Sequence, residues 1–465
     1  MQFLKKILIY FIGTIFNKLI IFILLPIYTR HLSPTDYGNA DLSITTVTML
    51  VSLLYIEVWT PLLRLSYDKD DSTHKAKVYC NSVIIALICT PIYIGGCIIM
   101  GVWQNLPYMV WMILYGLSIL VMHILQFEVR AIGDSKDFMI SGMISSVSQL
   151  ILSFVFIYVF HMGAQMILIS PAISNFLAAL YIEVKYKLIL LIKKSFYSSA
   201  LAKQIVRYSI PLAINAVAFW AMTNINRYFS RAYLGEEANG YIALATKFIS
   251  LINTLVQIFS LAWQESAYEH SNNADRSSYY SNMLKMYIDL MSVGTVLAIL
   301  FTNILFPYFI GNAYSATQMI LPIYYVSAFG SAISSFYGHI FNAEKKTDIL
   351  LYSTLAGAGV NILLLFMTIN KWQIYAVPIA LALGYCVNVA MRAFSIGFTV
   401  KIKFDIKRIF FDILQMTIAC ILIYANVHLL IKALFIIISS AYLFFSYKRI
   451  LSGIVFKLKN GKRSY

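Results

Sequence analysis

The chain has 465 residues, of which 60% are hydrophobic and only 12% are charged, with a mean hydropathy of +0.75. Soluble domains carry about 25% charged residues, so this composition excludes a set of soluble domains. We therefore expect lipid to be the main solvent. At about 20 residues per span and about 10 per connection, the chain has room for about 14 helices.

The formal net charge is +16. In a soluble protein such a charge indicates nucleic acid, but in a membrane protein basic residues collect on the cytoplasmic side, so no nucleic-acid partner is expected. The five cysteines lie in apolar runs without metal-ligand spacing. We expect neither a disulfide framework nor a metal site.

Apolar runs bounded by charged or turn-forming residues predict an all-α polytopic membrane protein, because backbone in lipid must satisfy its own hydrogen bonds. The first run resembles a signal peptide, but Asn17 and Lys18 interrupt it and no cleavage site follows, so we expect a retained helix. The predicted spans are 7–28, 40–64, 77–101, 107–128, 138–160, 164–185, 205–231, 239–265, 283–306, 318–342, 349–369, 373–398, 409–425 and 429–446.

The distribution of basic residues predicts the orientation of these spans. With the N-terminus inside, the inward segments collect 29 of the 36 Lys and Arg residues, and the outward segments collect 5. Because cytoplasmic loops retain Lys and Arg, both termini are predicted to be cytoplasmic.

Two parts of the chain resemble each other at an offset of 202 residues. His31–Gly38 aligns with Tyr233–Gly240, so that the leucines and the final glycines coincide. We expect these glycines to serve turns that need a positive φ. The same offset aligns two polar stripes at helical spacing. The first stripe is Thr45, Thr48, Ser52 and Tyr55, and the second is Lys247, Ser250, Thr254 and Gln257.

Six helices per repeat predict two parallel lobes related by an axis along the membrane normal. The expected organisation is an N-terminal six-helix lobe (1–190), a cytoplasmic linker (191–202), a C-terminal six-helix lobe (203–400), two additional transmembrane helices (401–446) and a basic cytoplasmic tail (447–465). We expect the tail to lie on the anionic inner leaflet.

Three short motifs resemble those of a known family. Leu25–Gly38 resembles the exit of the first helix in bacterial polysaccharide flippases, and Asn226–Tyr228 with Tyr233–Gly235 is similar to the exit of the seventh. Lys345–Thr347 with Val360–Ile362 resembles the segment from the tenth to the eleventh helix. These are the Wzx-type O-antigen and capsule-unit exporters of the multidrug/oligosaccharidyl-lipid/polysaccharide (MOP) superfamily. That family often has an acid before the seventh-helix arginine, where this chain has Asn226.

The resemblance implies two lobes around a central cavity, alternating access, and an ion or proton gradient as the driving force. It implies a multi-pass protein of the bacterial cytoplasmic (inner) membrane whose substrate is undecaprenyl pyrophosphate carrying an oligosaccharide. Membrane lipids and other membrane proteins of polysaccharide assembly are the further expected partners.

Cationic residues in or near the spans are candidates for holding the pyrophosphate. Lys18 lies midway in the first span, where a charge costs about 2.5–3.5 kcal/mol, so it faces a wet cavity or snorkels. Arg227 and Arg231 share a helix face and can fork onto phosphate oxygens or simply end the helix at the headgroups. The substrate-binding candidates are Lys18, Arg30, Arg64, Arg227, Arg231, Lys247, Ser250, Thr254 and Gln257.

Other polar residues have competing interpretations. The stripe headed by Lys247 either lines the cavity or makes hydrogen bonds between helices. Asp36 and Asp41 are grouped with Arg30 as charges at the first outward exit. The coupling candidates are Glu57 and Asp289, although Asp289 also stands at i+4 from Lys285 and can simply pair with it.

Catalytic motifs are missing from the sequence. It contains no P-loop and no metal-ligand cluster, so we predict neither an enzyme nor a cofactor. A membrane glycosyltransferase or polysaccharide polymerase remains an alternative, but it would need paired acids on a long outward loop. A multidrug antiporter of the same superfamily is the other alternative, and the predominance of Lys and Arg disfavours a cationic drug.

Overall fold

The computed structural model describes residues 20–460 except 21, 70, 271–272 and 345. Within these residues every assigned secondary-structure element is helical. The chain divides into two compact units, Met1–Lys247 (unit 1) and Phe248–Tyr465 (unit 2). Lys18 lies outside the described residues.

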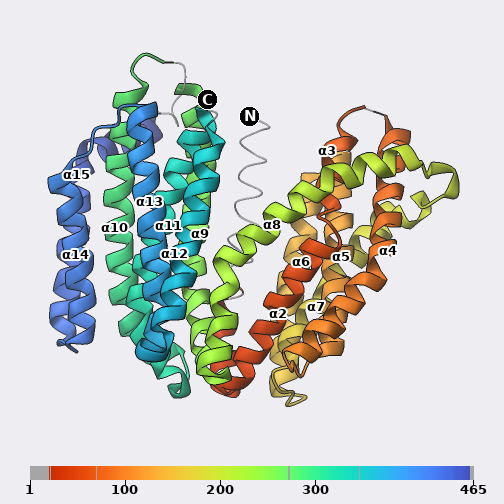
Figure 1. Ribbon diagram of the computed structural model, residues 1–465, viewed down its shortest axis with the longest axis horizontal. Helices are drawn as coiled ribbons and strands as arrows, with labels where there is room; N and C mark the ends of the chain where they lie inside the picture. Colours follow the sequence, from red (N-terminus) through yellow and green to blue (C-terminus); the bar gives the residue numbers. More distant parts are fainter. Residues whose placement is uncertain (1–19, 21, 70, 271–272, 345, 461–465) are drawn as a thin grey trace. The chain divides into compact units, whose positions relative to one another are not determined.

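Unit 1 is a helical bundle in which α5 packs against α2, α3, α4 and α7, and α6 packs against α7 (Figure 1). The long helix α8 contains Pro211 and contacts α2, α3 and α4. The helices are α2 (Pro34–Leu54), α3 (Trp59–Ser66), α4 (Ser72–Trp103), α5 (Met109–Ile132), α6 (Ser135–Tyr158), α7 (Met166–Tyr186) and α8 (Ser199–Leu234), with short 3₁₀ turns η1 (Leu188–Leu191) and η2 (Lys194–Phe196).

Unit 2 is a second helical bundle, and α9 (Glu236–His270) enters it from unit 1. Trp263 of α9 stacks on Phe336 with ring centroids 4.3 Å apart and donates its indole N–H to the Phe336 carbonyl at 3.1 Å. Helix α13 packs on α11 and α12, while α14 and α15 pack on α10. The other elements are α10 (Arg276–Phe309), η3 (Asn312–Tyr314), α11 (Ser315–Ala343), α12 (Thr347–Trp372), η4 (Gln373–Tyr375), α13 (Ala376–Thr399), α14 (Ile406–Tyr424) and α15 (Leu429–Asn460).

The helices support the expected multi-pass class. Among the described residues, 8 helical segments are long and apolar enough to cross a membrane, or up to 9 if one bent pair forms a single span. This confirms an all-helical protein with many apolar helices. The count of 14 spans and the side of the termini stay predictions, as does the division into two six-helix lobes. The predicted linker 191–202 lies inside unit 1, and the units divide within α9.

The predicted span 40–64 is broken. Helices α2 and α3 meet at an angle of 46°. Between them Ile56 and Glu57 have φ values of 49° and 54°, in the left-handed region that residues other than glycine rarely adopt. Turn hydrogen bonds replace the helical ladder there, as the Val58 N–H donates to the Tyr55 carbonyl at 3.1 Å. The predicted span 40–64 is therefore bent at this break, and the two helices together are long and apolar enough to form one broken span.

The repeat-related glycines Gly38 and Gly240 have a different role from the expected one. Both lie inside helices, and the residue with a positive φ is Gly235, at 90°, just before α9. A Cβ on Gly240 would lie 1.9 Å from the Pro34 carbonyl oxygen, and one on Gly38 would lie 2.7 Å from the Gly240 nitrogen. The start of α2 and the start of α9 therefore touch through backbone, and glycine is needed for close approach.

The predicted topology can be tested by cysteine labelling in a background without the five native cysteines. Ser33→Cys and Glu237→Cys are expected to react with an impermeant maleimide from outside intact cells, and Lys193→Cys only after the membrane is opened. All three positions are exposed, so accessibility reports the side of the membrane. Labelling of position 193 in intact cells would contradict the proposed orientation.

Candidate functional site

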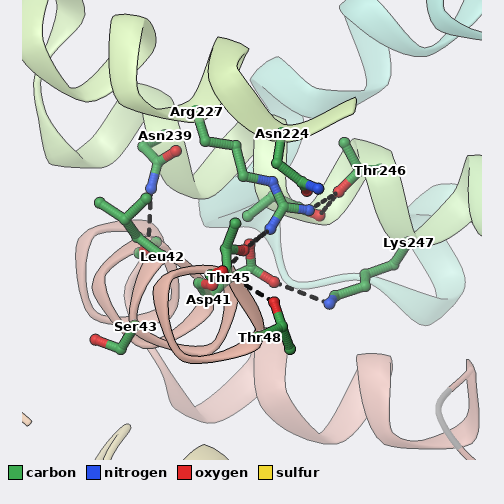
Figure 2. A network of polar contacts seen from close by, with 12 residues as sticks. Asp41, Leu42, Ser43, Thr45, Thr48, Asn224, Arg227, Asn239, Thr246 and Lys247 are labelled. Carbon is green, nitrogen blue, oxygen red and sulfur yellow. Dashed lines mark hydrogen bonds and ion pairs between the residues drawn. The ribbon is translucent and has the colours of Figure 1, made fainter. Parts of the chain in front are cut away.

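A buried carboxylate in unit 1 lies between two cations. Asp41 of α2 has a relative exposure of 1%. The Arg227 guanidinium of α8 forms an ion pair with its Oδ2, and the Lys247 ammonium of α9 lies 2.8 Å from its Oδ1. Figure 2 shows the three side chains converging from their separate helices. This group of residues, with Thr45 and Thr246, is called the Asp41 site below.

Two threonines complete the Asp41 site. Arg227 Nη1 donates to Thr45 Oγ1, and Nη2 donates to Thr246 Oγ1 at 2.7 Å (Figure 2). Thr45 stands one helical turn after Asp41 and donates to its backbone carbonyl at 2.8 Å. The guanidinium is thus held by one carboxylate and two hydroxyls, which together fix the orientation of the Arg227 side chain.

Local sequence explains how α2 presents these residues. Ser33 is the N-cap and accepts the Asp36 N–H at 3.1 Å, and Pro34 occupies the first turn, where it loses no helical hydrogen bond. Asp41 and Thr45 then fall on one face by their i,i+4 spacing. The first turns of α2 also make the close contact of Gly38 with Gly240, which fixes the distance between the starts of α2 and α9.

The charge of the Asp41 site is not balanced. It holds one carboxylate and two cations, and Arg227 is 8% exposed, while the Lys247 side chain keeps 27% of its accessible surface. Burying charges costs several kcal/mol per ion unless partners compensate. The surplus of about one positive charge makes this a place where an additional anion is favoured.

A second ion pair supports the site from the outward-side turn of the predicted topology. Arg231 Nη2 donates to Glu236 Oε1 at 2.6 Å, and Asn39 Nδ2 donates to Glu236 Oε2 at 2.8 Å. Burial raises the pKa of Glu236, but the hydrogen bonds from Asn39 and Arg231 outweigh it and hold the pKa below its usual value. Asn239 also donates to the Gly38 carbonyl at 2.9 Å. These contacts tie α8 and α9 to α2.

The structure brings together only some of the predicted substrate-binding residues. Arg227 and Lys247 meet at Asp41, with Arg231 one helical turn beyond. Arg30 is exposed on the helical segment before α2. Arg64 is exposed on α3 and pairs with Asp68 at 2.6 Å.

The rest of the predicted polar stripe lies further along α9, in unit 2. Thr254 is buried and donates to the Ser250 carbonyl at 2.8 Å, and Gln257 is exposed. Of the two coupling candidates, Glu57 is half-buried at the break between α2 and α3. A single cavity lined by both stripes stays a prediction.

The sequence leaves open a pairing of Asp289 with Lys285, and the structure gives each of them another partner. Lys285 pairs with Asp405 at 2.9 Å, and Asp289 pairs with Arg408 of α14. The hydrogen bond from Lys285, helped by the Arg408 backbone N–H, holds the pKa of Asp405 below its usual value. Asp289 is fully buried, and its partner is 119 residues away in sequence.

Solved structures share this fold at low sequence identity. The lipid II flippase MurJ in an inward closed conformation aligns with a TM-score of 0.70 and 16% identity over 95% of this chain and 99% of that chain. An inward-facing multidrug resistance MATE family transporter of the MOP superfamily aligns with a TM-score of 0.65 and 15% identity over 83% of this chain and 96% of that chain. A MOP superfamily transporter from Pyrococcus furiosus, described as having a binding pocket of reverse polarity, aligns with a TM-score of 0.54 and 16% identity over 85% of this chain and 95% of that chain.

These similarities show that the chain has the fold of these solved transporters. No curated protein sequence matches the chain. Residues 3–263 match the family described as Polysaccharide biosynthesis protein. That match covers more than half of the chain and confirms the resemblance noted from its motifs. The chain belongs to the polysaccharide biosynthesis protein family.

Proposed function

We propose that the protein is a flippase that moves undecaprenyl-pyrophosphate-linked oligosaccharide repeat units across the bacterial cytoplasmic membrane by alternating access. Its family assigns it to polysaccharide biosynthesis, and its fold is that of transporters. A polymer built from lipid-linked units needs a protein that carries those units across the membrane. The other expected partners are membrane lipids and the membrane proteins that assemble the polymer.

The observation that carries this proposal is the convergence of Arg227 and Lys247 on the single carboxylate of Asp41. A pyrophosphate presents several anionic oxygens, and Arg and Lys are the residues that bind phosphate oxygens most strongly. Asp41 holds the two cations apart and oriented when no substrate is present. A substrate diphosphate then competes with Asp41 for the same N–H donors.

The position of Lys247 favours this exchange. Its side chain is partly exposed, whereas Arg227 is nearly buried and fixed by Thr45 and Thr246. Lys247 can therefore turn toward a ligand without leaving an unpaired charge in the interior, because Arg227 still neutralises Asp41. We assign Lys247 to capture of the anion and Arg227 to its orientation.

The competing assignment is a multidrug antiporter, since a MATE family transporter shares the fold. A cationic drug would be repelled by a site with a surplus positive charge. The Asp41 site therefore favours the anionic substrate.

The proposed function is tested by deleting the gene and analysing the lipid-linked sugars. Loss of a flippase is expected to accumulate complete repeat units on the cytoplasmic face, as judged by protection from an impermeant oxidant that attacks exposed sugars. Lys247→Met is expected to reproduce much of this accumulation at normal membrane abundance, and Lys247→Arg to export substantially. Incomplete repeat units in the deletion strain would point instead to a glycosyltransferase.

A further inference from the structure

A second buried polar cluster lies in unit 2, where α10 packs against α14 and α15. Asp289 of α10 has both carboxylate oxygens engaged. Arg408 Nε donates to its Oδ1 at 2.7 Å, Arg408 Nη2 forms an ion pair with its Oδ2, and the Tyr447 hydroxyl donates to the same oxygen. Asp289 is thus fully satisfied as a carboxylate.

Asp412 of the same cluster is satisfied on one side only. It is fully buried, and its Oδ1 accepts from Ser292 Oγ at 2.8 Å and from Gln415 Nε2 at 2.9 Å. Its Oδ2 is buried without a hydrogen-bond partner in the part of the chain that the structure describes. An orphaned buried carboxylate oxygen is costly unless something occupies it.

The charges around Asp412 do not compensate two carboxylates. Asp289 lies close enough to repel it, and Arg408 is the cation that attracts it. Arg408, however, directs its donors to Asp289 and to the Tyr447 hydroxyl. Two buried carboxylates against one guanidinium leave one negative charge uncompensated in a medium of low dielectric. Binding of one proton removes that charge.

We propose that Asp412 and Asp289 form a proton-binding pair, with one exchangeable proton held on Asp412 Oδ2. This deepens the proposed flippase function, on which it rests, by assigning proton binding to unit 2. The proton gives Asp412 a donor that can reach Asp289. On its release a second negative charge stands beside Asp289 and competes for Arg408, which weakens the attachment of α14 to α10.

Water can reach this pair through a neighbouring cavity. A cavity of about 740 Å³ is lined by both acids and by Lys285, Asp405 and Arg408. Such a polar cavity is roomy enough to hold water, which carries protons to and from a buried acid. Lys403 and Lys407 also line it and are exposed.

The surroundings of the pair contain few other titratable groups. Two tyrosines of α15, Tyr442 and Tyr447, interact electrostatically with Arg408 and with the acids of the pair. The Arg408 guanidinium lies 5.8 Å and 5.7 Å from the centroids of these two rings. Helix α11 also packs on α14 and contains no Asp, Glu, Lys or Arg, and its titratable imidazole is that of the half-buried His339. The proton is therefore expected to reside on the carboxyl pair.

The test is infrared spectroscopy of the purified full-length protein in lipid nanodiscs, titrated with pH in the absence of substrate. The wild type is expected to show a protonated carboxyl band that disappears as the pH rises. All variants are compared in a Glu128→Gln background, because Glu128 is another buried carboxyl with an oxygen that lacks a hydrogen-bond partner among the described residues. In that background Asp412→Asn is expected to abolish the band, because an amide has the shape of a protonated acid but does not titrate. Asp405→Asn, at an exposed acid of the same cavity, is the matched control and is expected to keep the band.

Persistence of the band in Asp412→Asn would overturn the proposal, and so would a spectrum that changes with Na⁺ but not with pH. Asp412→Glu guards against misfolding, since it is expected to keep the band with a shifted midpoint. The readout needs no transport. Failure of the proposed function would appear as unchanged lipid-linked sugars in the deletion strain, with the titrating band still present.

Discussion

Gly240→Ala is expected to destabilise unit 1 by about 3 kcal/mol or more, or to prevent its folding. The added Cβ would lie 1.9 Å from the Pro34 carbonyl oxygen and 2.6 Å from its carbon, so it collides with backbone and not with a mobile side chain. Overpacking usually costs about 1–3 kcal/mol, and the cost rises where the neighbour cannot move. Thermal unfolding in detergent and membrane abundance measure the effect.

Gly95→Ala is the matched control, because Gly95 also lies inside a helix of unit 1 and a Cβ there meets nothing within 4 Å. Alanine is preferred to glycine in a helix by about 1 kcal/mol, so this variant is expected to be as stable as the wild type or slightly more stable. Gly38→Ala should fall between the two, since its Cβ would lie 2.7 Å from the Gly240 nitrogen. Equal melting temperatures for all three variants would show that α2 and α9 are not held in this close contact.

The sequence predicts some features of this molecule because they are local or repeated. The polar stripes at an offset of 202 align Thr45 with Lys247, and the structure places both at the same buried ion pair. The family resemblance is carried by short motifs at helix ends, and it is confirmed. Apolar composition also predicts an all-helical membrane protein.

Other features depend on partners that are distant in sequence. Asp41 and Arg227 are 186 residues apart, so the helical position of Asp41 says nothing about its two cations. Local spacing favours a pair of Lys285 with Asp289, whereas tertiary packing gives each of them another partner. The break at Ile56 itself contains neither Gly nor Pro, and the signal that does exist is Pro61, which stands in the first turn of α3, where proline marks a helix start.

The Asp41 site should behave as one energetic unit in a double-mutant cycle. Arg227→Met is expected to destabilise the protein by about 2–3 kcal/mol, because Asp41 then keeps only the partly exposed Lys247 and the hydroxyls of Thr45 and Thr246 lose a charged donor. Asp41→Asn is expected to cost a similar amount, since two cations then lack their carboxylate. Arg64→Met, at an exposed i,i+4 pair, is the stability control and should cost less than about 1 kcal/mol.

The double variant Asp41→Asn with Arg227→Met is expected to recover most of this loss. Lys247 then remains as the site's cation, and its partly exposed side chain can be solvated. This variant distinguishes stability from export. Stability depends on the Arg227–Asp41 ion pair, whereas export depends on the orientation of the pyrophosphate by Arg227. A restored melting temperature without restored export would fit a substrate-binding role for Arg227. Recovery of both would reduce the pair to a structural clamp, and recovery of neither would mean that Arg227 and Asp41 contribute independently.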